Sequence, residues 1–348
     1  MRIKVAMLVA AVAASLVQFV SQAAALPPKT KVQGYKSGLN FPIDMAWVPG
    51  TKKLFFTEKS GKIRILKGRK LKSRPCATLN VNSQGERGLL GIALHPNFKS
   101  NRYLYVYFTK ASPLQHQVKR FTVRKGRCRQ PKVIVSGISA KSNGYHNGGQ
   151  VEFAGGKLYV STGEQHDPGL AQDTSNRLGK ILRYNPNGSI PKDNPFGNAV
   201  WSYGHRNPFG LAHKPGTTKV YSTENGPSCD DEFNVIKKGR NYGWGSGYQC
   251  GTRGVGPNPK KPEVRWSNII VPTDPTFYKG QMKALNGDVY VGDFRGNVRR
   301  LIMNSDDTRV RKQRLILRDQ GGVTDVTKGP GGWLYLATTT SIKRIVPK

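Results

Sequence analysis

One histidine stands where the sequence could place a general base. The segment GYHNGGQVEF puts His146 directly before an alternating apolar run, and Gly148 and Gly149 would let a ligand approach the backbone closely. A neutral imidazole is the usual side chain for taking a proton from a hydroxyl near neutral pH. A histidine with a purely structural role is the alternative. We predict that His146 is a catalytic base at the start of a strand.

Charged side chains follow in the next two segments. YVSTGEQHD puts Glu164 and His166 after an alternating run, and WSYGHRNPFGLAH supplies Arg206 and Asn207 before another. Groups that emerge from strand ends can converge on one pocket. A surface ion pair between Glu164 and Arg206 is the alternative. Both residues lie in loops with a nearby glycine and outside the strand alternation, so we favour the pocket.

A third segment, ENGPSCDDEF, combines carbonyl and carboxylate oxygens. Asp231 and Glu232 follow a Gly226-Pro227 turn whose carbonyls are free to point inward. Calcium prefers such mixed oxygen ligands, although the spacing is not that of an EF-hand. The sequence has no HExxH, CxxC pair, GxSxG elbow or helix-opening GxGxxG, which excludes the zinc peptidase, redox dithiol, α/β-hydrolase and nicotinamide classes.

Six similar segments could position these residues. Each has an apolar stretch, a Pro/Gly/Asn turn and an alternating strand. Equivalent positions at Leu54, Leu104, Leu158, Val220, Val289 and Leu334 are 50, 54, 62, 69 and 45 residues apart. This period suits four strands with variable loops. We predict an all-β fold, a six-bladed β-propeller with four-stranded antiparallel blades; a pair of β-sandwiches is the weaker alternative.

The N-terminal segment indicates where the protein is located. A basic start, an apolar run from Val5 to Val20 and small residues before Leu26 predict a cleavable signal peptide over residues 1–25. The rest, residues 26–348, is predicted to form a single β-propeller domain that is periplasmic or secreted. No later segment is apolar enough to cross a membrane.

The four cysteines also fit an oxidising compartment. Cys76, Cys128, Cys229 and Cys250 allow three pairings. We favour Cys229 with Cys250, because that bond would pin the short segment between them. Unpaired thiols are the alternative.

The chain is strongly basic. Its formal net charge of +36 falls to +34 when Arg2 and Lys4 leave with the signal peptide. Such a field attracts polyanions in general. The basic residues are scattered, with local runs only at 68–74 and 310–314, and no nucleic-acid-binding module is present. We expect affinity for an anionic polysaccharide or membrane surface, and no specific nucleic acid.

Several of these segments are similar to one family. The chain resembles the soluble pyrroloquinoline quinone (PQQ)-dependent glucose and aldose sugar dehydrogenases and their hedgehog-interacting-protein-like relatives. The matching strings are GERGLLGIALHPNF (85–98), HNGGQVEF (146–153), GKLYVSTGE (156–164), LGKILRYNPNGSIPKDNPF (178–196), YGHRNPFGLA (203–212) and GPSCDDEFNVIKKGRNYGW (226–244).

The resemblance implies a reaction. His146 would take the proton from the C1 hydroxyl of an aldose or oligosaccharide while hydride passes to PQQ, and the product would be a lactone. Arg206 and Asn207 would lie against the cofactor, and Glu164 would orient Arg206. An external electron acceptor would reoxidise the quinone.

The resemblance also implies Ca²⁺. Gly226, Pro227 and Asp231 would hold the cofactor-bound ion, and Glu232 and Tyr242 match positions of a second, structural ion. A divalent cation on the quinone oxygens would stabilise the charge that develops there.

Two features depart from the family pattern. The chain reads QGGVTDV where the family has Arg-x-Arg-Asp-Val, so Gly322 and Thr324 replace two anion-binding arginines. Arg295 remains as a basic cofactor-binding position. Glu86 stands where an amide is common, and Arg87 is its expected partner.

These departures leave an alternative open. A calcium-containing propeller could keep the scaffold and bind a carbohydrate or protein partner without turnover. Hydrolysis of a lactone on a calcium propeller ranks last, because it does not explain the GHRNP and HNGG strings.

Overall fold

The structure is a computed structural model that describes residue 26 and residues 29–348. The predicted signal peptide, residues 1–25, lies outside the described residues. Strands dominate the described chain, and its helical elements are short. They are α1 (Phe98–Asn101), α2 (Pro168–Gln172) and the 3₁₀ turns η1 (Lys283–Leu285) and η2 (Pro330–Gly332). None of the helices in this part of the chain is long and apolar enough to cross a membrane.

Three sheets contain four antiparallel strands each, and their order follows the chain. The first has β7 (Leu89–Leu94), β8 (Tyr103–Lys110), β9 (Gln115–Arg124) and β10 (Arg127–Ser139). The second has β11 (Val151–Ala154), β12 (Lys157–Thr162), β13 (Lys180–Tyr184) and β14 (Val200–Tyr203). The third has β15 (Pro208–His213), β16 (Val220–Glu224), β17 (Asp231–Ile236) and β18 (Val264–Trp266).

The two other sheets are larger. One holds β2 (Pro42–Trp47), β3 (Lys53–Glu58), β4 (Lys62–Lys67) and β5 (Lys70–Leu71), and β6 (Ala77–Thr78) also pairs with β4. The other has eight strands in the order β1-β25-β24-β23-β19-β20-β21-β22. They are β1 (Thr30–Ser37), β19 (Pro272–Tyr278), β20 (Asp288–Asp293), β21 (Val298–Met303), β22 (Val310–Leu317), β23 (Val323–Lys328), β24 (Leu334–Thr338) and β25 (Ser341–Pro347).

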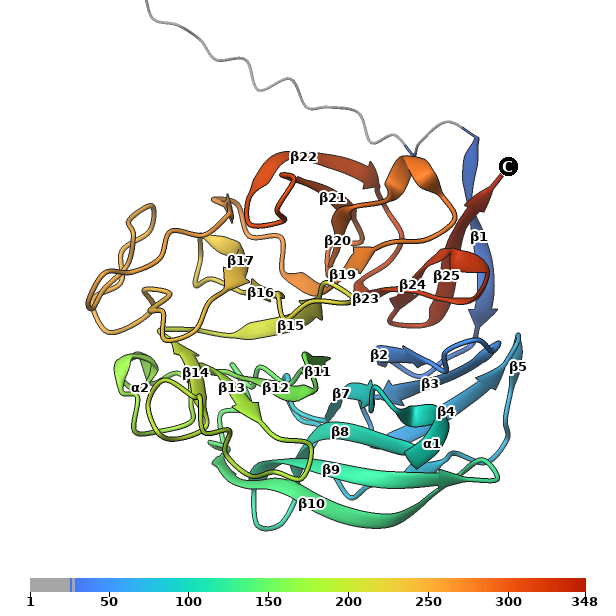
Figure 1. Ribbon diagram of the computed structural model, residues 1–348, viewed down its shortest axis with the longest axis horizontal. Coiled ribbons are helices and arrows are strands. Elements are labelled where there is room, and N and C mark those ends of the chain that lie inside the picture. Colours follow the sequence, from blue (N-terminus) through green and yellow to red (C-terminus); the bar gives the residue numbers. More distant parts are fainter. Residues whose placement is uncertain (1–25, 27–28) are drawn as a thin grey trace, which may run out of the picture.

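This pairing confirms an all-β propeller but corrects the predicted number of separate blades. The described strands form five hydrogen-bonded sheets around a common centre, not six independent four-stranded ones (Figure 1). The reason is one parallel bridge between β19 and β23, at Asp274 and Asp325, that fuses two strand runs into a single sheet. Sequence periodicity reports strand spacing and carries no information about such a bridge.

The two ends of the described chain close the ring. β1 pairs antiparallel with β25, from Thr30 opposite Pro347 to Ser37 opposite Ser341. Figure 1 shows these first and last strands side by side. Because the sheet edge of β25 is covered by β1, the last sheet depends on residues from the start of the domain.

These segments form strands because alternate side chains point to opposite faces of the sheet, and each face packs into a different hydrophobic core. In β8, Tyr105 and Tyr107 pack into one cluster, while Leu104, Val106 and Phe108 pack into the next. Each face of the sheet is therefore buried against a neighbouring sheet. Burying large side chains on both faces stabilises the stacking of sheets around the ring.

The antiparallel pairing also brings certain loops together at one edge of the molecule, which we call the site edge. In each sheet the innermost strand starts where the second strand ends, as in the pairing of Val151 with Val160 between β11 and β12. Loops that precede innermost strands and loops that follow second strands therefore meet at the same edge.

Both pairs of cysteines form disulfides. Cys229 bonds Cys250, which confirms the favoured pairing, and Cys76 bonds Cys128. The described chain has no free cysteine.

Candidate active site

Four loops bring the predicted catalytic residues to the site edge. Glu86 precedes β7, His146 precedes β11, Glu164 follows β12, and Arg206 and Asn207 precede β15. These are loops before innermost strands and after a second strand. The prediction that the residues emerge at strand ends is therefore consistent with the structure.

His146 is held by a carboxylate. Its Nδ1 lies 2.5 Å from Oε1 of Glu164, and the two residues are 7% and 1% exposed. The other oxygen of Glu164 accepts the backbone N–H of Asp167. Because Nδ1 is engaged, the neutral ring presents its Nε2 lone pair, and Nε2 makes no hydrogen bond within the described residues.

The pairing of Glu164 corrects its expected partner. The sequence assigned this carboxylate to Arg206, whereas the structure hydrogen-bonds it to His146. The link to Arg206 is through the backbone: the N–H of Glu164 donates to the Arg206 carbonyl at 2.9 Å. A surface ion pair between the two is also excluded, because Glu164 is buried.

A close backbone approach makes this geometry possible. A Cβ built on Gly163 would lie 2.0 Å from the carbonyl oxygen of His146. Only glycine therefore lets the strand end beside His146, and that contact sets the distance between the histidine and Glu164. His146 itself has a left-handed backbone with φ of 50°. Such strain in a non-glycine residue is common at functional sites.

Glu86 ties two loops together. Its Oε2 accepts the backbone N–H of His146 at 2.8 Å and the side-chain amide of Asn207 at 3.2 Å. Asn207 in turn accepts the N–H of Gly148 at 3.0 Å. The expected pairing of Glu86 with Arg87 is wrong, because Arg87 donates to backbone carbonyls of the 84 and 141–142 loops.

Arg206 is half-buried with spare hydrogen-bonding capacity. Its Nη1 donates to the Asn225 carbonyl at 2.9 Å, and its guanidinium carbon lies 5.3 Å from the Trp244 ring centroid. Its Nε is buried and has no partner among the described residues. Burial lowers the pKa of Arg206, and the carboxylates of Glu164 and Glu224 act in the opposite direction.

A second histidine covers the first. The rings of His146 and His166 are 3.9 Å apart between centroids, with 35° between their planes. Burial, followed by the electrostatic interaction with His146, lowers the pKa of His166. The sequence placed His166 at a strand end but assigned it no role, because ring stacking between loops has no local signal.

The predicted calcium loop is only partly arranged for a cation. The carbonyls of Gly226 and Pro227 accept no hydrogen bond from any described residue. Both oxygens of Asp231, by contrast, accept backbone N–H groups: one from Gly226, and the other from Ile270 and Val271. Asp231 therefore holds the loop in place through these backbone contacts, and burial raises the pKa of Asp231.

The two residues predicted to hold a second calcium ion, Glu232 and Tyr242, each make local contacts. Glu232 accepts the side-chain amide of Asn234 at 2.9 Å, and burial followed by the charge of Glu224 raises the pKa of Glu232 to about 8. The Tyr242 hydroxyl donates to the Val235 carbonyl at 2.7 Å. The structure thus uses both predicted ligands in separate local contacts.

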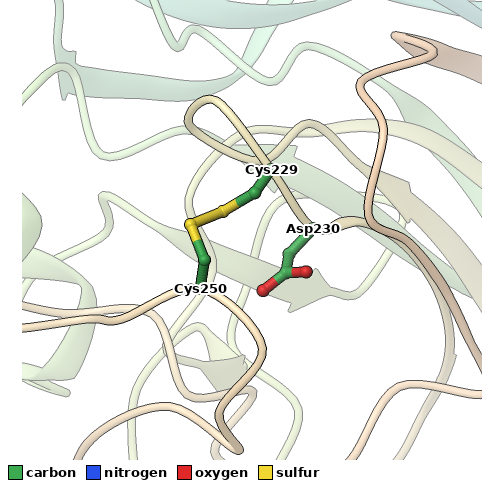
Figure 2. Close-up of side chains that lie close together, drawn as sticks. All are labelled: Cys229, Asp230 and Cys250. Atoms are coloured by element: carbon green, nitrogen blue, oxygen red, sulfur yellow. A yellow bond between two sulfur atoms is a disulfide. The ribbon is translucent and has the colours of Figure 1, made fainter.

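A third cluster in this region is a disulfide rather than a metal centre. Cys229, Asp230 and Cys250 place three potential ligand atoms together, but Figure 2 shows the two sulfur atoms bonded to each other. The Asp230 carboxylate accepts the Tyr248 hydroxyl at 2.8 Å and the Gly251 N–H at 2.6 Å. Asp230 and the disulfide together fix the 229–251 loop.

The segments around Gly322 and Thr324 have little charge in place of the expected arginines. Arg295 is exposed in the turn between β20 and β21. A Cβ on Gly322 would lie 3.2 Å from Phe294, and the Thr324 hydroxyl donates to the Pro42 carbonyl at 2.8 Å. Neither position offers the cation expected there.

Sequence analysis missed three buried aspartates. Asp44, Asp274 and Asp325 each occupy the third position of an innermost strand, in the strings PID, PTD and VTD. This shared position was the signal available in the sequence. None of the three aspartates is among the equivalent repeat positions used above.

The chain matches a known family over most of its length. The family model for glucose/sorbosone dehydrogenase matches residues 39–346. Aldose sugar dehydrogenase YliI of Escherichia coli is 29% identical over 353 aligned positions, which cover 91% of this chain and 92% of that protein. Quinoprotein glucose dehydrogenase B of Acinetobacter calcoaceticus is 36% identical over 245 positions, 60% of this chain and 51% of that protein.

A solved structure agrees. The PQQ-bound form of aldose sugar dehydrogenase from Streptomyces coelicolor superposes with a TM-score of 0.80 at 29% identity, covering 93% of this chain and 100% of that chain. The two folds are therefore alike over most of the chain. This chain belongs to the glucose/sorbosone dehydrogenase family.

Proposed function

We propose that this protein is a quinoprotein dehydrogenase that oxidises the C1 hydroxyl of an aldose or oligosaccharide to a lactone. The observation that carries the proposal is the buried His146–Glu164 pair, with 2.5 Å between Nδ1 and Oε1. The names of the relatives supply the substrate class and the quinone. The His146–Glu164 pair would supply the general base that this oxidation requires.

His146 is suited to act as the base. With Nδ1 bonded to Glu164, Nε2 would take the proton of the C1 hydroxyl, and the C1 hydrogen would leave with its electron pair. Bound PQQ would supply the acceptor for that hydride. Loss of two electrons from the cyclic hemiacetal leaves a lactone. Glu164 would stabilise the imidazolium formed when the proton arrives.

Arg206 and Asn207 fit one wall of a site for an anionic, planar cofactor. The partnerless Nε of Arg206 can still donate to a carboxylate, and a guanidinium suits such a partner. Arg295 is one cation near Gly322, because its neighbour Phe294 contacts that glycine. Glu86 is compatible with an anionic ligand, since its carboxylate is already engaged by two N–H donors.

The residues of the 226–231 loop fit Ca²⁺ through carbonyl oxygens. Gly226 and Pro227 have carbonyls that no described residue occupies, and calcium accepts such ligands. Asp231 would hold the loop in place through its three backbone N–H contacts. A cation there would stabilise negative charge that develops on a nearby oxygen.

A second candidate function is a non-catalytic propeller that binds a carbohydrate or protein partner. The uncharged Gly322 and Thr324 favour it, because a multiply charged cofactor would lose two bidentate partners. Only the dehydrogenase would bind PQQ and turn over a sugar, so measurements of cofactor binding and of turnover distinguish the two functions.

Reconstitution tests the proposal. The purified protein would be incubated with Ca²⁺ and PQQ and assayed for dye reduction with a panel of aldoses and oligosaccharides. We expect reduction by the unaltered protein and a fall in kcat of about 10²- to 10⁴-fold in His146→Ala, with cofactor binding retained. His95→Ala, at the opposite end of β7, is the matched control and should keep its activity. Absence of both binding and reduction across the panel would refute the enzyme.

We also propose a location and a domain organisation for the protein. Residues 1–25 would act as a cleaved signal peptide, residues 26–348 would fold as one domain, and the mature protein would be periplasmic or secreted. An external electron acceptor would complete the catalytic cycle.

A surface groove supports the proposed anionic polysaccharide or membrane partner. The groove, of about 650 Å³, is lined by seven cations and no acid. They are Lys52, Lys53, Lys67, Lys72, Arg74, Lys125 and Arg127. Burial, followed by the charge of Arg102, lowers the pKa of Lys53 there, as expected where like charges crowd.

A further inference from the structure

A cavity of about 300 Å³ lies between the innermost strands of the propeller. Its lining comes from all six innermost strands, β2, β7, β11, β15, β19 and β23, which surround the centre in Figure 1. Three of those strands contribute an aspartate: Asp44, Asp274 and Asp325. One carboxylate oxygen from each lies within 4.8 Å of the others.

The backbone turns these aspartates toward one another. Each occupies the third position of its strand, where the pairing with the next strand is irregular. An irregularity of this kind redirects a side chain. The bridge that joins β19 to β23 pairs Asp274 directly with Asp325. The cluster is therefore a product of the strand architecture and not of mobile surface loops.

Backbone amides hold two of the carboxylates in place. Asp44 accepts the N–H of Met45 and of Ile92, both at 2.6 Å, and Asp274 accepts the N–H of Leu211 at 2.8 Å. The second oxygen of Asp274 has no such contact within the described residues. Carboxylates oriented by amides and left with free lone pairs are suited to coordinate a cation.

Asp325 supplies an independent sign of a missing partner. It is 1% exposed, and its Oδ2 is buried with no hydrogen-bond partner among the described residues. A buried carboxylate oxygen without a partner is costly. A ligand that binds all three aspartates would remove that cost.

The charge of the cluster is not balanced by the protein. None of the three aspartates forms an ion pair within the described residues, and the nearby Glu152 is already paired with His213 at 2.6 Å. Burial, followed by the charge of Asp44, raises the pKa of Asp274 and of Asp325 well above the ordinary range. Three carboxylates in this cavity therefore need either protons or a cation.

We infer that Asp44, Asp274 and Asp325 form a binding site for a hard divalent cation, Ca²⁺, on the propeller axis. The donors are all oxygens, which calcium prefers, and bonds of roughly 2.3–2.6 Å would span ligand oxygens up to about 5 Å apart. Two charges of the ion would leave one net negative charge. The site is separate from the Gly226–Asp231 loop and does not depend on the proposed function.

Metal counting on the full, PQQ-free protein tests the site. After EDTA treatment and dialysis against Ca²⁺, bound metal per chain would be measured by mass spectrometry for the unaltered protein, Asp325→Asn and Asp319→Asn. We expect Asp325→Asn to bind one Ca²⁺ fewer per chain. Asp319 is exposed, so the same change there should leave the count unchanged. Equal counts in all three proteins would overturn the site, as would no Ca²⁺ bound to the unaltered protein.

Terbium luminescence gives a second readout. Trp47 lines the same cavity, so Tb³⁺ bound to the cluster should show emission sensitised by this indole and displaced by Ca²⁺. The emission should be lost in Asp325→Asn through loss of the ion, and in Trp47→Phe through loss of the sensitiser with the metal count unchanged. Unaltered emission in Asp325→Asn would contradict the site. If Asp325→Asn does not fold, Asp274→Asn would be measured in the same two ways.

Discussion

The chemistry of this protein depends on how one histidine is held. His146 contacts Glu164 through Nδ1, Glu86 through its backbone N–H, and the ring of His166 through stacking. Glu164 and His166 lie in the loop after β12, and Glu86 lies in the loop before β7. A base fixed in this way needs little reorganisation before it accepts a proton, which is the advantage of a supported site.

Glu164→Gln tests the supporting role of the carboxylate. The amide keeps the shape but cannot stabilise an imidazolium as a carboxylate does, so kcat should fall by about 10²-fold or more with KM nearly unchanged. Steady-state kinetics of the reconstituted enzyme measures the two constants separately. The melting temperature should be close to that of the unaltered protein. A change confined to KM would contradict a positioning role.

The loops of the site are themselves supported by a buried polar network. His116, on β9, is fully buried, with Nδ1 3.0 Å from the Thr109 hydroxyl and Nε2 2.5 Å from the Gln165 side chain. Gln165 also accepts the N–H of Lys141 at 2.7 Å. The strand element therefore anchors both the loop before His146 and the loop that carries Glu164.

This network predicts a pH dependence of stability. Burial lowers the pKa of His116 from 6.5 to about 3, so the unfolded chain binds more protons than the folded one between these values. This contribution to the free energy of unfolding is fully present above pH 6.5 and is lost as the pH falls toward 3, on the order of 5 kcal/mol in total. Urea unfolding at pH 7, 5 and 4 measures it. His116→Gln should flatten that dependence; an unchanged slope would contradict the assignment.

The two disulfides close chain segments of different lengths. Cys229–Cys250 closes a separation of 21 residues, and Cys76–Cys128 closes one of 52. Replacing each pair by serine should lower the free energy of unfolding by about 3 and about 4 kcal/mol respectively, because the longer loop loses more entropy on closure. Chemical denaturation compares the two variants. The opposite order would show that native contacts, not loop length, dominate.

The whole molecule combines a strongly positive surface with acidic side chains around its central cavity. Its formal charge is +36, yet four acids, Glu152 and the three aspartates of the axial cluster, line the central cavity. These two features favour opposite ligands: polyanions outside and a cation inside. The ring closure between β1 and β25 keeps the sheets around that cavity.

Binding of a sulfated polysaccharide should depend on the basic groove. Replacing three exposed cations there, Lys67, Lys72 and Arg74, by glutamine should lower the salt concentration at which the protein elutes from a sulfated-polysaccharide column. The matched control replaces the exposed Arg311, Lys312 and Arg314 of β22, which changes the net charge equally. Equal shifts in both variants would show that only the net charge matters.

The sequence by itself determined the residue types of the site, their place at strand ends, the all-β propeller and one disulfide. Strand alternation and turn residues are local properties, so a linear reading detects them. Only the tertiary structure decided that Glu164 binds His146, that Glu86 binds Asn207 and that Asp274 pairs with Asp325 between the neighbouring strands β19 and β23. Those contacts join residues 18 to 121 positions apart, which the closed ring of sheets brings together.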